Sequence, residues 1–357
     1  MSVFIIAEAG VNHNGDIKKA MELVEVAAQA GADAVKFQTF KAESLVAKDA
    51  PKASYQVRNT GVDDGQYAML KALELSADDH RVLLSHCQKL GIGFLSSPFD
   101  RQSLDFLADD LGLGVIKLGS GEITNAPLLL AAGRKARHVI LSTGMSTLVE
   151  IEDALGVLAF AATTPNDAQP GASSFRAAYA SKEGKLALYN KVTLLHCTTD
   201  YPAIPEDANL KAIPAMAERF KLRVGFSDHT PGIVISLGAV ALGATVIEKH
   251  LTLDRTLPGP DHMASLEPGD FKSLVDGVRL LEGALGDGVK RCMASEQGNR
   301  LVARKSLAAI KTIAKGDAYT KDNIGALRPG DGISPMAYWE MLGTSAAADL
   351  NPGDRIQ

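Results

Sequence analysis

Two lysines stand inside apolar runs of the sequence, where a charged side chain is normally excluded. Lys36 lies in AVKFQTF and Lys117 lies in VIKLGSGE. In an extended strand Lys36 shares its face with Gln38, and the residues between them point the other way. One such lysine could be a snorkelling or ion-paired residue, because lysine is rarely buried unpaired. Two of them, one followed by a glycine-rich turn containing Ser120, indicate a site for a phosphate or carboxylate.

Two histidines also follow apolar runs, His229 in GFSDHT and His250 in VIEKH. A lone histidine is more often a satisfied polar residue than a ligand, but two at neighbouring strand ends could share a metal ion. With Glu8 and Asp261 as nearby carboxylates, the pair suits a divalent ion such as manganese, with positions left open for water and substrate. The sequence has no well-placed third histidine or cysteine, which argues against a structural zinc site.

Two acidic residues are candidates for the sugar or water end of such a site. Glu8 in AEAGVNHNG has the parity of an inward-facing residue. Alternatively, Glu8 could simply form an ion pair with one of the strand lysines. Asp261 and His262 lie in GPDHMASLEP, which could be a plain solvated turn. Loops at strand ends commonly carry function, so we expect Asp261 to take part.

The elements that must position these residues alternate along the chain. A helix is predicted over 17–30, where Ala20, Leu23, Val24 and Ala27 are spaced for one apolar face. Eight strands are predicted at FIIAEAG, AVKFQTF, GIGFLSSP, VIKLGSGE, HVILSTGM, VTLLHCTT, VGFSDHT and TVIEKHLT. This count predicts a (β/α)8 TIM barrel, in which the carboxyl ends of all strands meet at one mouth. A doubly wound sheet alternates in the same way, but no strand here is followed by GxGxxG.

The remaining segments complete the expected domain organisation. Residues 163–190 are rich in Ala, Ser and Gly, and we expect a long peripheral loop with at most a helical turn around 175–180. A helix over 270–285 is predicted to close the barrel domain, 1–287, before a turn-rich linker, 288–298. In 299–357 short strands alternate with Gly/Pro turns, as in a small β-rich domain.

Composition excludes several classes of function. The 357 residues are 46% hydrophobic and 22% charged, with a formal net charge of -5 at pH 7. This balance argues against a broad nucleic-acid or membrane-binding surface. Three scattered cysteines do not make a disulfide framework and fit a reducing compartment. No secretory leader and no apolar run long enough to cross a bilayer are evident, so a cytoplasmic location is expected.

The whole series of motifs resembles one family. The motifs are FIIAEAGVNHNG, GADAVKFQTFKAE, FLSSPFD, KLGSGE, LSTGM, LLHCTTDYP, GFSDHT, GAVALGATVIEKHLTLDR, GPDHMASLEP, VARKSLAA and RPGDGISP. In this order and spacing they closely resemble the bacterial N-acetylneuraminate (sialic acid) synthase family. The resemblance covers nearly the whole chain, and the tail is similar to the family's antifreeze-like SAF domain.

The resemblance implies a fold, an assembly and a reaction. The fold is a TIM barrel followed by the SAF domain, in a domain-swapped homodimer where each small domain covers the partner's barrel. The reaction condenses phosphoenolpyruvate, water and the open-chain form of N-acetylmannosamine, giving N-acetylneuraminate and phosphate.

The resemblance also implies roles for particular residues. His229 and His250 are expected to hold a divalent ion, manganese or magnesium. Glu8, Asp261 and Lys117 are expected to act in catalysis. The expected phosphoenolpyruvate ligands are Lys36, Gln38, Asn59, Lys117, Ser120, Ser142 and Ser227. The expected sugar ligands are Glu8, Tyr201, Asp261 and Arg328.

Alternatives remain open at the level of the sequence. Thr199 stands where some family members carry asparagine, so a polar contact to the sugar could differ. Legionaminic or pseudaminic acid synthases share the chemistry and take a 2,4-diacetamido-trideoxyhexose instead. A metal-dependent pyruvate aldolase would not need the paired lysines. A protein that only binds polysaccharide would not need all the residues expected to take part in the reaction, which are His229, His250, Lys36, Lys117 and Glu8.

Overall fold

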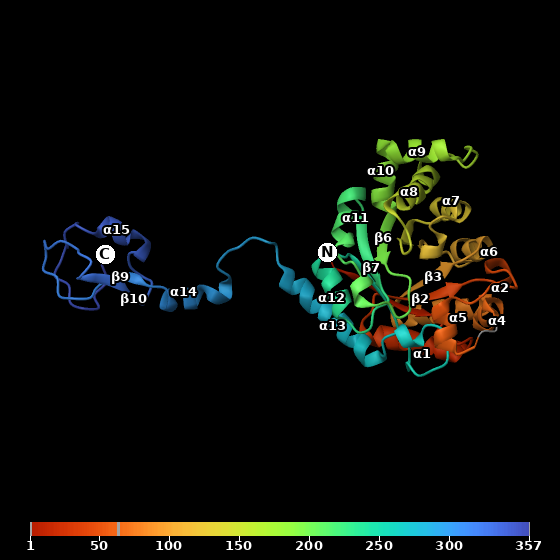
Figure 1. Cartoon of the computed structure of the whole chain (residues 1–357), viewed down its shortest axis with the longest axis horizontal. Helices are drawn as coiled ribbons and strands as arrows, with labels where there is room; N and C mark the ends of the chain where they lie inside the picture. The colour runs from red at the N-terminus through yellow and green to blue at the C-terminus, as the bar shows by residue number, and fades with distance from the viewer. Residues whose placement is uncertain (1, 63–64, 357) are drawn as a thin grey trace. The chain divides into compact units, whose positions relative to one another are not determined.

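The structure, a computed structural model, describes residues 2–62 and 65–356. The chain divides into two compact units, one reaching to Gly286 and the other beginning at Asp287 (Figure 1). Each unit has a hydrophobic core of its own. Among the described residues, every helix is too short or too polar to cross a lipid bilayer.

Eight parallel strands form the wall of a barrel in the first unit, which confirms the TIM-barrel class. Their hydrogen-bonded order is β3-β2-β1-β8-β7-β6-β5-β4, and the strands at its two ends, β3 and β4, pack against each other. The strands are β1 (Phe4–Gly10), β2 (Ala34–Thr39), β3 (Gly93–Pro98), β4 (Val115–Leu118), β5 (His138–Ser142), β6 (Val192–Cys197), β7 (Arg223–Asp228) and β8 (Val246–His250).

Helices cover the outside of this barrel between successive strands (Figure 1). They are α1 (Ile17–Ala30), α5 (Ala77–Leu90), α6 (Arg101–Asp105), α7 (Ala126–Lys135), α8 (Leu148–Thr163), α11 (Ala212–Phe220), α12 (Val234–Ala241) and α13 (Pro268–Leu285). The first helix has the predicted bounds because its ends are capped: the Asp16 side chain accepts a hydrogen bond from the Lys18 amide, and Gly31 takes a φ of 86°. In the described part of the segment between β2 and α5 there are three short helices, α2 (Ala42–Leu45), α3 (Ser54–Thr60) and α4 (Gln66–Leu73).

Side-chain alternation divides every strand between the helix layer and the barrel interior. One interior layer is apolar and consists of Ile6, Ala34, Leu95, Ile140, Leu195 and Val246, with Val115 against it. Residues two positions further along have the same parity and form the next layer toward the mouth. That layer is largely polar and contains Glu8, Lys36, Ser97, Lys117, Ser142, Cys197 and Glu248. The barrel therefore supplies an apolar floor for a charged site.

The segment between α8 and β6 is helical, so the predicted long loop is wrong for most of 163–190. It folds into α9 (Ala172–Ala180) and α10 (Lys182–Lys191), and both pack on α8. The ring of Phe175 lies 5.3 Å from that of Phe160 on α8. Because α8 is apolar around most of its circumference, it needs this outer cover, and tertiary packing forms helices whose alanine-rich sequence has little periodicity.

The second unit is small and contains a two-stranded antiparallel ladder, β9 (Ser306–Ala309) with β10 (Ile324–Leu327). Two short helices belong to it, α14 (Gln297–Ala303) and α15 (Tyr338–Met341). Its core is made by Leu307, Ala309, Ile313, Tyr319, Ile324, Ala346 and Ile356. The predicted β-rich tail is confirmed, with most of its backbone in turns and isolated bridges.

Candidate active site

A buried cluster of charges occupies the polar layer of the barrel. The Lys36 ammonium lies 2.7 Å from Oε2 of Glu8 and 3.3 Å from Oε2 of Glu248. Lys117 lies 3.5 Å from the other oxygen of Glu248 and donates a 2.8 Å hydrogen bond to Oγ of Ser142. These contacts follow from register, since Glu8 pairs with Lys36 across β1 and β2. The two predicted anion-binding lysines are thus brought together, with carboxylates between them.

Further predicted residues surround this cluster. Ser227 donates a 2.8 Å hydrogen bond to Oε1 of Glu248. The Gln38 amide lies 3.4 Å from Oε1 of Glu8. Lys36 also contacts Oγ of Ser97, which was not among the predicted site residues, at 3.3 Å. The cluster therefore carries hydroxyl and amide groups that can turn toward an incoming anion.

Burial and the neighbouring charges shift the pKa values of Glu8 and Glu248 in opposite directions. Burial raises the pKa of Glu8 above its usual value, and the attraction of Lys36 only partly offsets this. Burial also acts on Glu248, but the charges of Lys117 and Lys36 outweigh it and hold the pKa of that carboxyl below its usual range. Burial lowers the pKa of Lys117. Glu248 is therefore the fixed negative charge of the cluster, and Glu8 is the group that can carry a proton.

His229 and His250 meet at the mouth, with ring centroids 5.5 Å apart. Nδ1 of His229 donates a 2.6 Å hydrogen bond to the Thr198 carbonyl, because a carbonyl can only accept, so Nε2 keeps its lone pair. Among the described residues, Nδ1 of His250 is buried and has no hydrogen-bond partner. Burial lowers the pKa of His229 to about 4 and that of His250 well below its usual value. Both rings are neutral near pH 7 and can offer lone pairs to a cation.

These two donors fit a divalent cation that keeps open coordination positions. In the described residues no group of three or more His, Cys, Asp or Glu side chains is arranged to enclose a metal ion. A site with two protein ligands leaves the other positions to water and substrate, which is typical of catalytic rather than structural metal sites.

Aromatic rings cover the histidines on the loop side. The Tyr201 ring lies 4.2 Å from His229 and 5.6 Å from His250. The Tyr55 ring, on α3, lies 4.9 Å from that of Tyr201. Burial raises the pKa of both phenols, so both stay neutral and can donate hydrogen bonds. Tyr55 was not among the predicted site residues.

Asn59 joins three loops of the mouth. Its amide donates to the Tyr201 carbonyl at 3.1 Å and to the Pro260 carbonyl at 2.6 Å. Its Oδ1 is buried and has no partner among the described residues. Asn59 therefore ties the segment after β2 to the segments after β6 and β8, and it keeps one buried acceptor for a ligand.

Asp261 lies on the loop after β8 and is only 7% exposed. Burial raises the pKa of its carboxyl to about 6, and Lys36 acts in the opposite direction. A carboxyl with this pKa is mostly ionised near pH 7 and can accept a proton during a reaction.

Ser120 and Gly144 line another side of the mouth. The Ser120 hydroxyl accepts a 2.9 Å hydrogen bond from the Gly144 amide and lies 3.1 Å from Sγ of Cys197. A Cβ on Gly144 would meet Oγ1 of Thr199 at 2.3 Å, Ser120 at 2.8 Å and Cys197 at 3.0 Å. A glycine is thus required here by space.

We therefore predict that Gly144→Ala weakens anion binding while the protein stays folded. The added methyl must displace Ser120 and Thr199, so KM for the anionic substrate is expected to rise about tenfold, as for the loss of one hydrogen bond to a charged group. Steady-state kinetics and a thermal melt measure the two effects. Gly283→Ala, in helix α13, is the matched control, because a Cβ there meets nothing within 4 Å. Equal KM values in the two variants would contradict the prediction.

Arg328 belongs to the second unit. It follows β10 directly and is exposed. Its predicted contact with the sugar in the partner's barrel stays a prediction.

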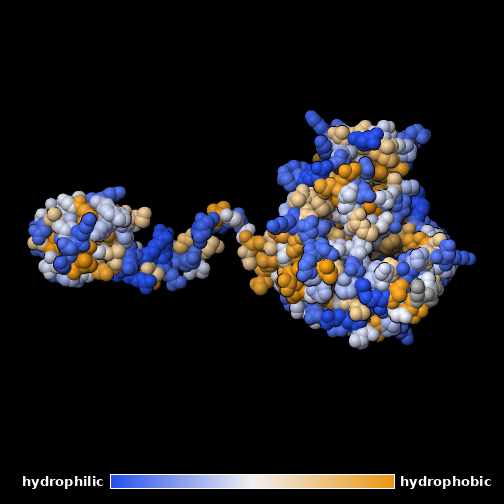
Figure 2. Space-filling view, in the orientation of Figure 1, coloured by the Kyte–Doolittle hydropathy of each residue, from blue (hydrophilic) through white to orange (hydrophobic). Residues whose placement is uncertain are grey.

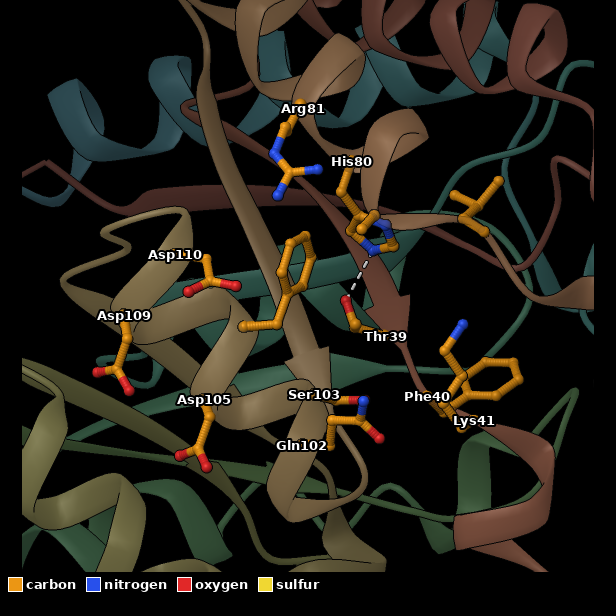
Figure 3. Close-up of a pocket in the computed structure, with 13 residues that line it drawn as sticks. Thr39, Phe40, Lys41, His80, Arg81, Gln102, Ser103, Asp105, Asp109 and Asp110 are labelled. Carbon is orange, nitrogen blue, oxygen red and sulfur yellow. Dashed lines mark hydrogen bonds between the residues drawn. The ribbon is translucent and has the colours of Figure 1, made fainter.

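A separate cavity of about 360 Å³ lies on the outer side of the barrel wall (Figure 3). Thr39, whose parity is outward, and His80 of α5 line it, together with Asp105, Asp109 and Asp110. His80 is fully satisfied, because Nε2 lies 2.8 Å from Oγ1 of Thr39 and Nδ1 lies 2.8 Å from the Ser76 carbonyl. None of the predicted site residues lines this cavity, so we place the active site at the barrel mouth.

Glu248 is the most informative residue that sequence reasoning missed. It lies in VIEKH and shares the parity of His250, so strand alternation alone could have placed it inside the barrel. Its contacts to both lysines make it the centre of the cluster.

Fold and site together define a class: a (β/α)8 barrel with a buried lysine–carboxylate cluster and a histidine pair at the carboxyl ends of its strands. The model of the NeuB family matches residues 23–290 and that of the SAF domain matches residues 304–357. The chain belongs to the NeuB family of nonulosonic acid synthases, which condense phosphoenolpyruvate with a sugar, and the resemblance found in its motifs is confirmed.

Individual relatives extend over the whole chain. The N,N'-diacetyllegionaminic acid synthase of Campylobacter jejuni is 47% identical over 99% of this chain and 98% of its own length. The enzyme of the same name from Legionella pneumophila is 44% identical over 100% of this chain and 94% of its own. Among solved structures, the N-acetylneuraminic acid synthetase of Leptospira borgpetersenii is 34% identical, has a TM-score of 0.68 and covers 84% of this chain and 90% of its own.

Proposed function

We propose that this chain is an N,N'-diacetyllegionaminic acid synthase, which condenses phosphoenolpyruvate with a 2,4-diacetamido-trideoxyhexose and releases phosphate. The observation that carries this choice is the 47% and 44% identity to two synthases of that name over nearly their full lengths. The similar neuraminic acid synthetase structure is 34% identical. The comparisons thus favour the second of the two expected acceptors over N-acetylmannosamine.

The reaction joins C3 of phosphoenolpyruvate to the aldehyde carbon of the open-chain sugar. Water then adds at C2, and phosphate leaves as the C2–O bond breaks. A divalent ion held by His229 and His250, manganese or magnesium, would supply Lewis-acid polarisation of the aldehyde.

The chain's own residues bind and orient the anion. Lys36 and Lys117 attract the phosphate and carboxylate of phosphoenolpyruvate into a site from which bulk water is largely excluded. Ser120, Ser142 and Ser227 carry hydroxyls that can donate to the same oxygens. This arrangement places the enol carbon at a fixed distance from the acceptor and so lowers the entropic part of the barrier.

Two carboxyl groups handle protons. Asp261, ionised near neutral pH, orients the attacking water and accepts its proton. Glu8, whose pKa burial raises, can hold a proton toward a sugar hydroxyl. Tyr201 and Tyr55 form the aromatic side of the sugar pocket.

We also propose the domain-swapped homodimer that the family resemblance implies, in which Arg328 reaches the acetamido group of the partner's substrate. Exposed apolar side chains in the last part of α13, Leu280 and Leu285, offer a surface for such an assembly. Figure 2 shows apolar atoms at this place on the visible face.

The proposed function is tested by incubating the protein with phosphoenolpyruvate, manganese and each of a panel of acetamido sugars, and by measuring the phosphate that is released. Release with a 2,4-diacetamido-trideoxyhexose and little with N-acetylmannosamine supports the proposal. Release with N-acetylmannosamine alone would return the assignment to a neuraminate synthase, and no release with any sugar would overturn the synthase proposal.

The pH dependence of the reaction is a separate prediction. Because the carboxylate form of Asp261 is the active one, kcat/KM should rise with pH through about 6, as this group loses its proton. Asp261→Asn should abolish this acid limb and slow the reaction at every pH. Asp254→Asn, on the same loop but exposed, is the matched control and should keep the limb. An unchanged limb in Asp261→Asn would assign the proton to another group.

A further inference from the structure

An ion pair that the mechanism does not use lies directly behind the two histidines. Asp228 is the last residue of β7 and directly precedes His229, and Lys249 precedes His250, the last residue of β8. The two residues face each other in register, and the Lys249 ammonium lies 2.9 Å from Oδ2 of Asp228. Both side chains are 0% exposed. Strand parity puts them on the outer face of the barrel, opposite the site.

The pair also holds the backbone and the helix beside it. Lys249 donates to the Thr230 carbonyl, and Oδ1 of Asp228 accepts from the Thr230 amide at 2.8 Å and the Thr230 hydroxyl at 2.7 Å. Ser236, on α12, donates to Oδ2 of Asp228 at 2.5 Å. The residues on both sides of His229 are thus tied to this one ion pair. His229 itself is held through its backbone, because its carbonyl accepts a 2.9 Å hydrogen bond from the Ala203 amide.

Stability alone does not explain a buried ion pair at this position. The preceding outward positions of the same strands are apolar and buried: Val224 and Phe226 on β7, and Ile247 on β8. Well-packed apolar residues are commonly as stabilising as a buried ion pair, or more so, because both charges must be desolvated. The outward pattern changes from apolar to ionic only at the level of the histidines.

We propose that Asp228 and Lys249 are positioning residues that set the separation and orientation of His229 and His250. The ion pair fixes the end of β7 against the end of β8, so the two rings keep the separation at which they can share one cation. This inference rests on the proposed role of the histidines and deepens it. Groups that hydrogen-bond directly to metal ligands change metal affinity by about 10- to 100-fold when removed, and for this pair, which acts through the backbone, we expect the lower end of that range.

The test is manganese binding, measured by electron paramagnetic resonance of free Mn²⁺ during titration of the full chain. The variant Asp228→Asn/Lys249→Met removes both charges together and leaves no unpaired buried charge. It keeps an acceptor for the Thr230 amide. We expect its manganese dissociation constant to rise about tenfold.

Thr39→Val is the matched control. It removes a buried outer-face hydrogen-bond network, that of Thr39 with His80 and Ser96, from the end of β2. Its manganese affinity should stay at the wild-type value even if its melting temperature falls by the same amount. Ser236→Ala removes only the α12 contact to Asp228 and should lower the manganese affinity by a smaller factor. It replaces the double variant in the test if the double variant does not fold.

The outcomes separate the two proposals. Wild-type affinity in the folded double variant, or in Ser236→Ala if that is the variant that folds, would overturn the positioning role and leave the histidine site intact. Manganese that fails to bind the wild-type chain would overturn the histidine metal site, and the positioning role with it. A loss of affinity in the charge-free variant, absent from Thr39→Val at equal stability, supports the proposal.

Discussion

Replacing Lys36 with methionine is expected to lower kcat/KM for phosphate release by about 10³-fold, as for loss of a main electrostatic contact in a buried site. The same change leaves Glu8 and Glu248 without their shared cation, 2.7 and 3.3 Å away in the wild type. Breaking a buried pair in this way costs about 3–5 kcal/mol of unfolding free energy. Steady-state kinetics and urea unfolding measure the two losses independently.

The loss of stability should depend on pH in a defined direction. Without Lys36 the pKa of Glu8 rises further and that of Glu248 rises from its lowered value, so the folded variant binds protons more tightly than the folded wild type. The deficit relative to wild type should therefore be smaller at about pH 5 than at about pH 8. A deficit that grows toward low pH would contradict the proposed charge balance.

Two further variants separate the roles of Lys36. Lys36→Met/Glu8→Gln removes the carboxylate whose ion-pair partner is Lys36, while Glu248 keeps Lys117 at 3.5 Å, so it should recover part of the stability but none of the activity. Lys41→Met is the matched control, because Lys41 follows the same strand and its ion pair with Glu74, at 3.6 Å, is partly exposed. It should shift the unfolding free energy by no more than about 1 kcal/mol.

Strand parity explains why so much of the site could be predicted from the sequence. Once eight strands are aligned, residues such as Lys36, Lys117, His229 and His250 must share the interior, because the side-chain period of a strand is two. The structure places all four there. Their types then indicate anion and cation chemistry without any knowledge of distances.

The parts that could not be predicted depend on contacts between segments distant in the sequence. Glu248 is one of three consecutive polar residues in its strand, and only its lysine partners, on β2 and β4, show its place in the site. Asn59 contacts carbonyls that follow two other strands. Helix α9 forms against α8, a partner that its own composition does not indicate.

His250→Ala is expected to reduce manganese-dependent phosphate release by about 10³-fold or more, because metal polarisation of a carbonyl contributes several kcal/mol to the barrier. The fold should survive. The described structure gives Nδ1 of His250 no hydrogen-bond partner, so the mutation removes a neutral ring and its packing rather than a polar network. We expect a change of about 2 kcal/mol or less in unfolding free energy.

The control and the chelated wild type complete this prediction. His138→Ala removes a histidine at the start of β5, the opposite end of the barrel, where its Nε2 lies 3.0 Å from Oγ1 of Thr193, and it should keep the metal dependence. Chelated wild type and His250→Ala should share the same residual rate, since both retain the lysine–carboxylate cluster. If manganese still accelerates phosphate release by His250→Ala as it does for wild type, His250 is not a ligand. If the residual rates agree, their common value measures what the anion cluster contributes without the metal.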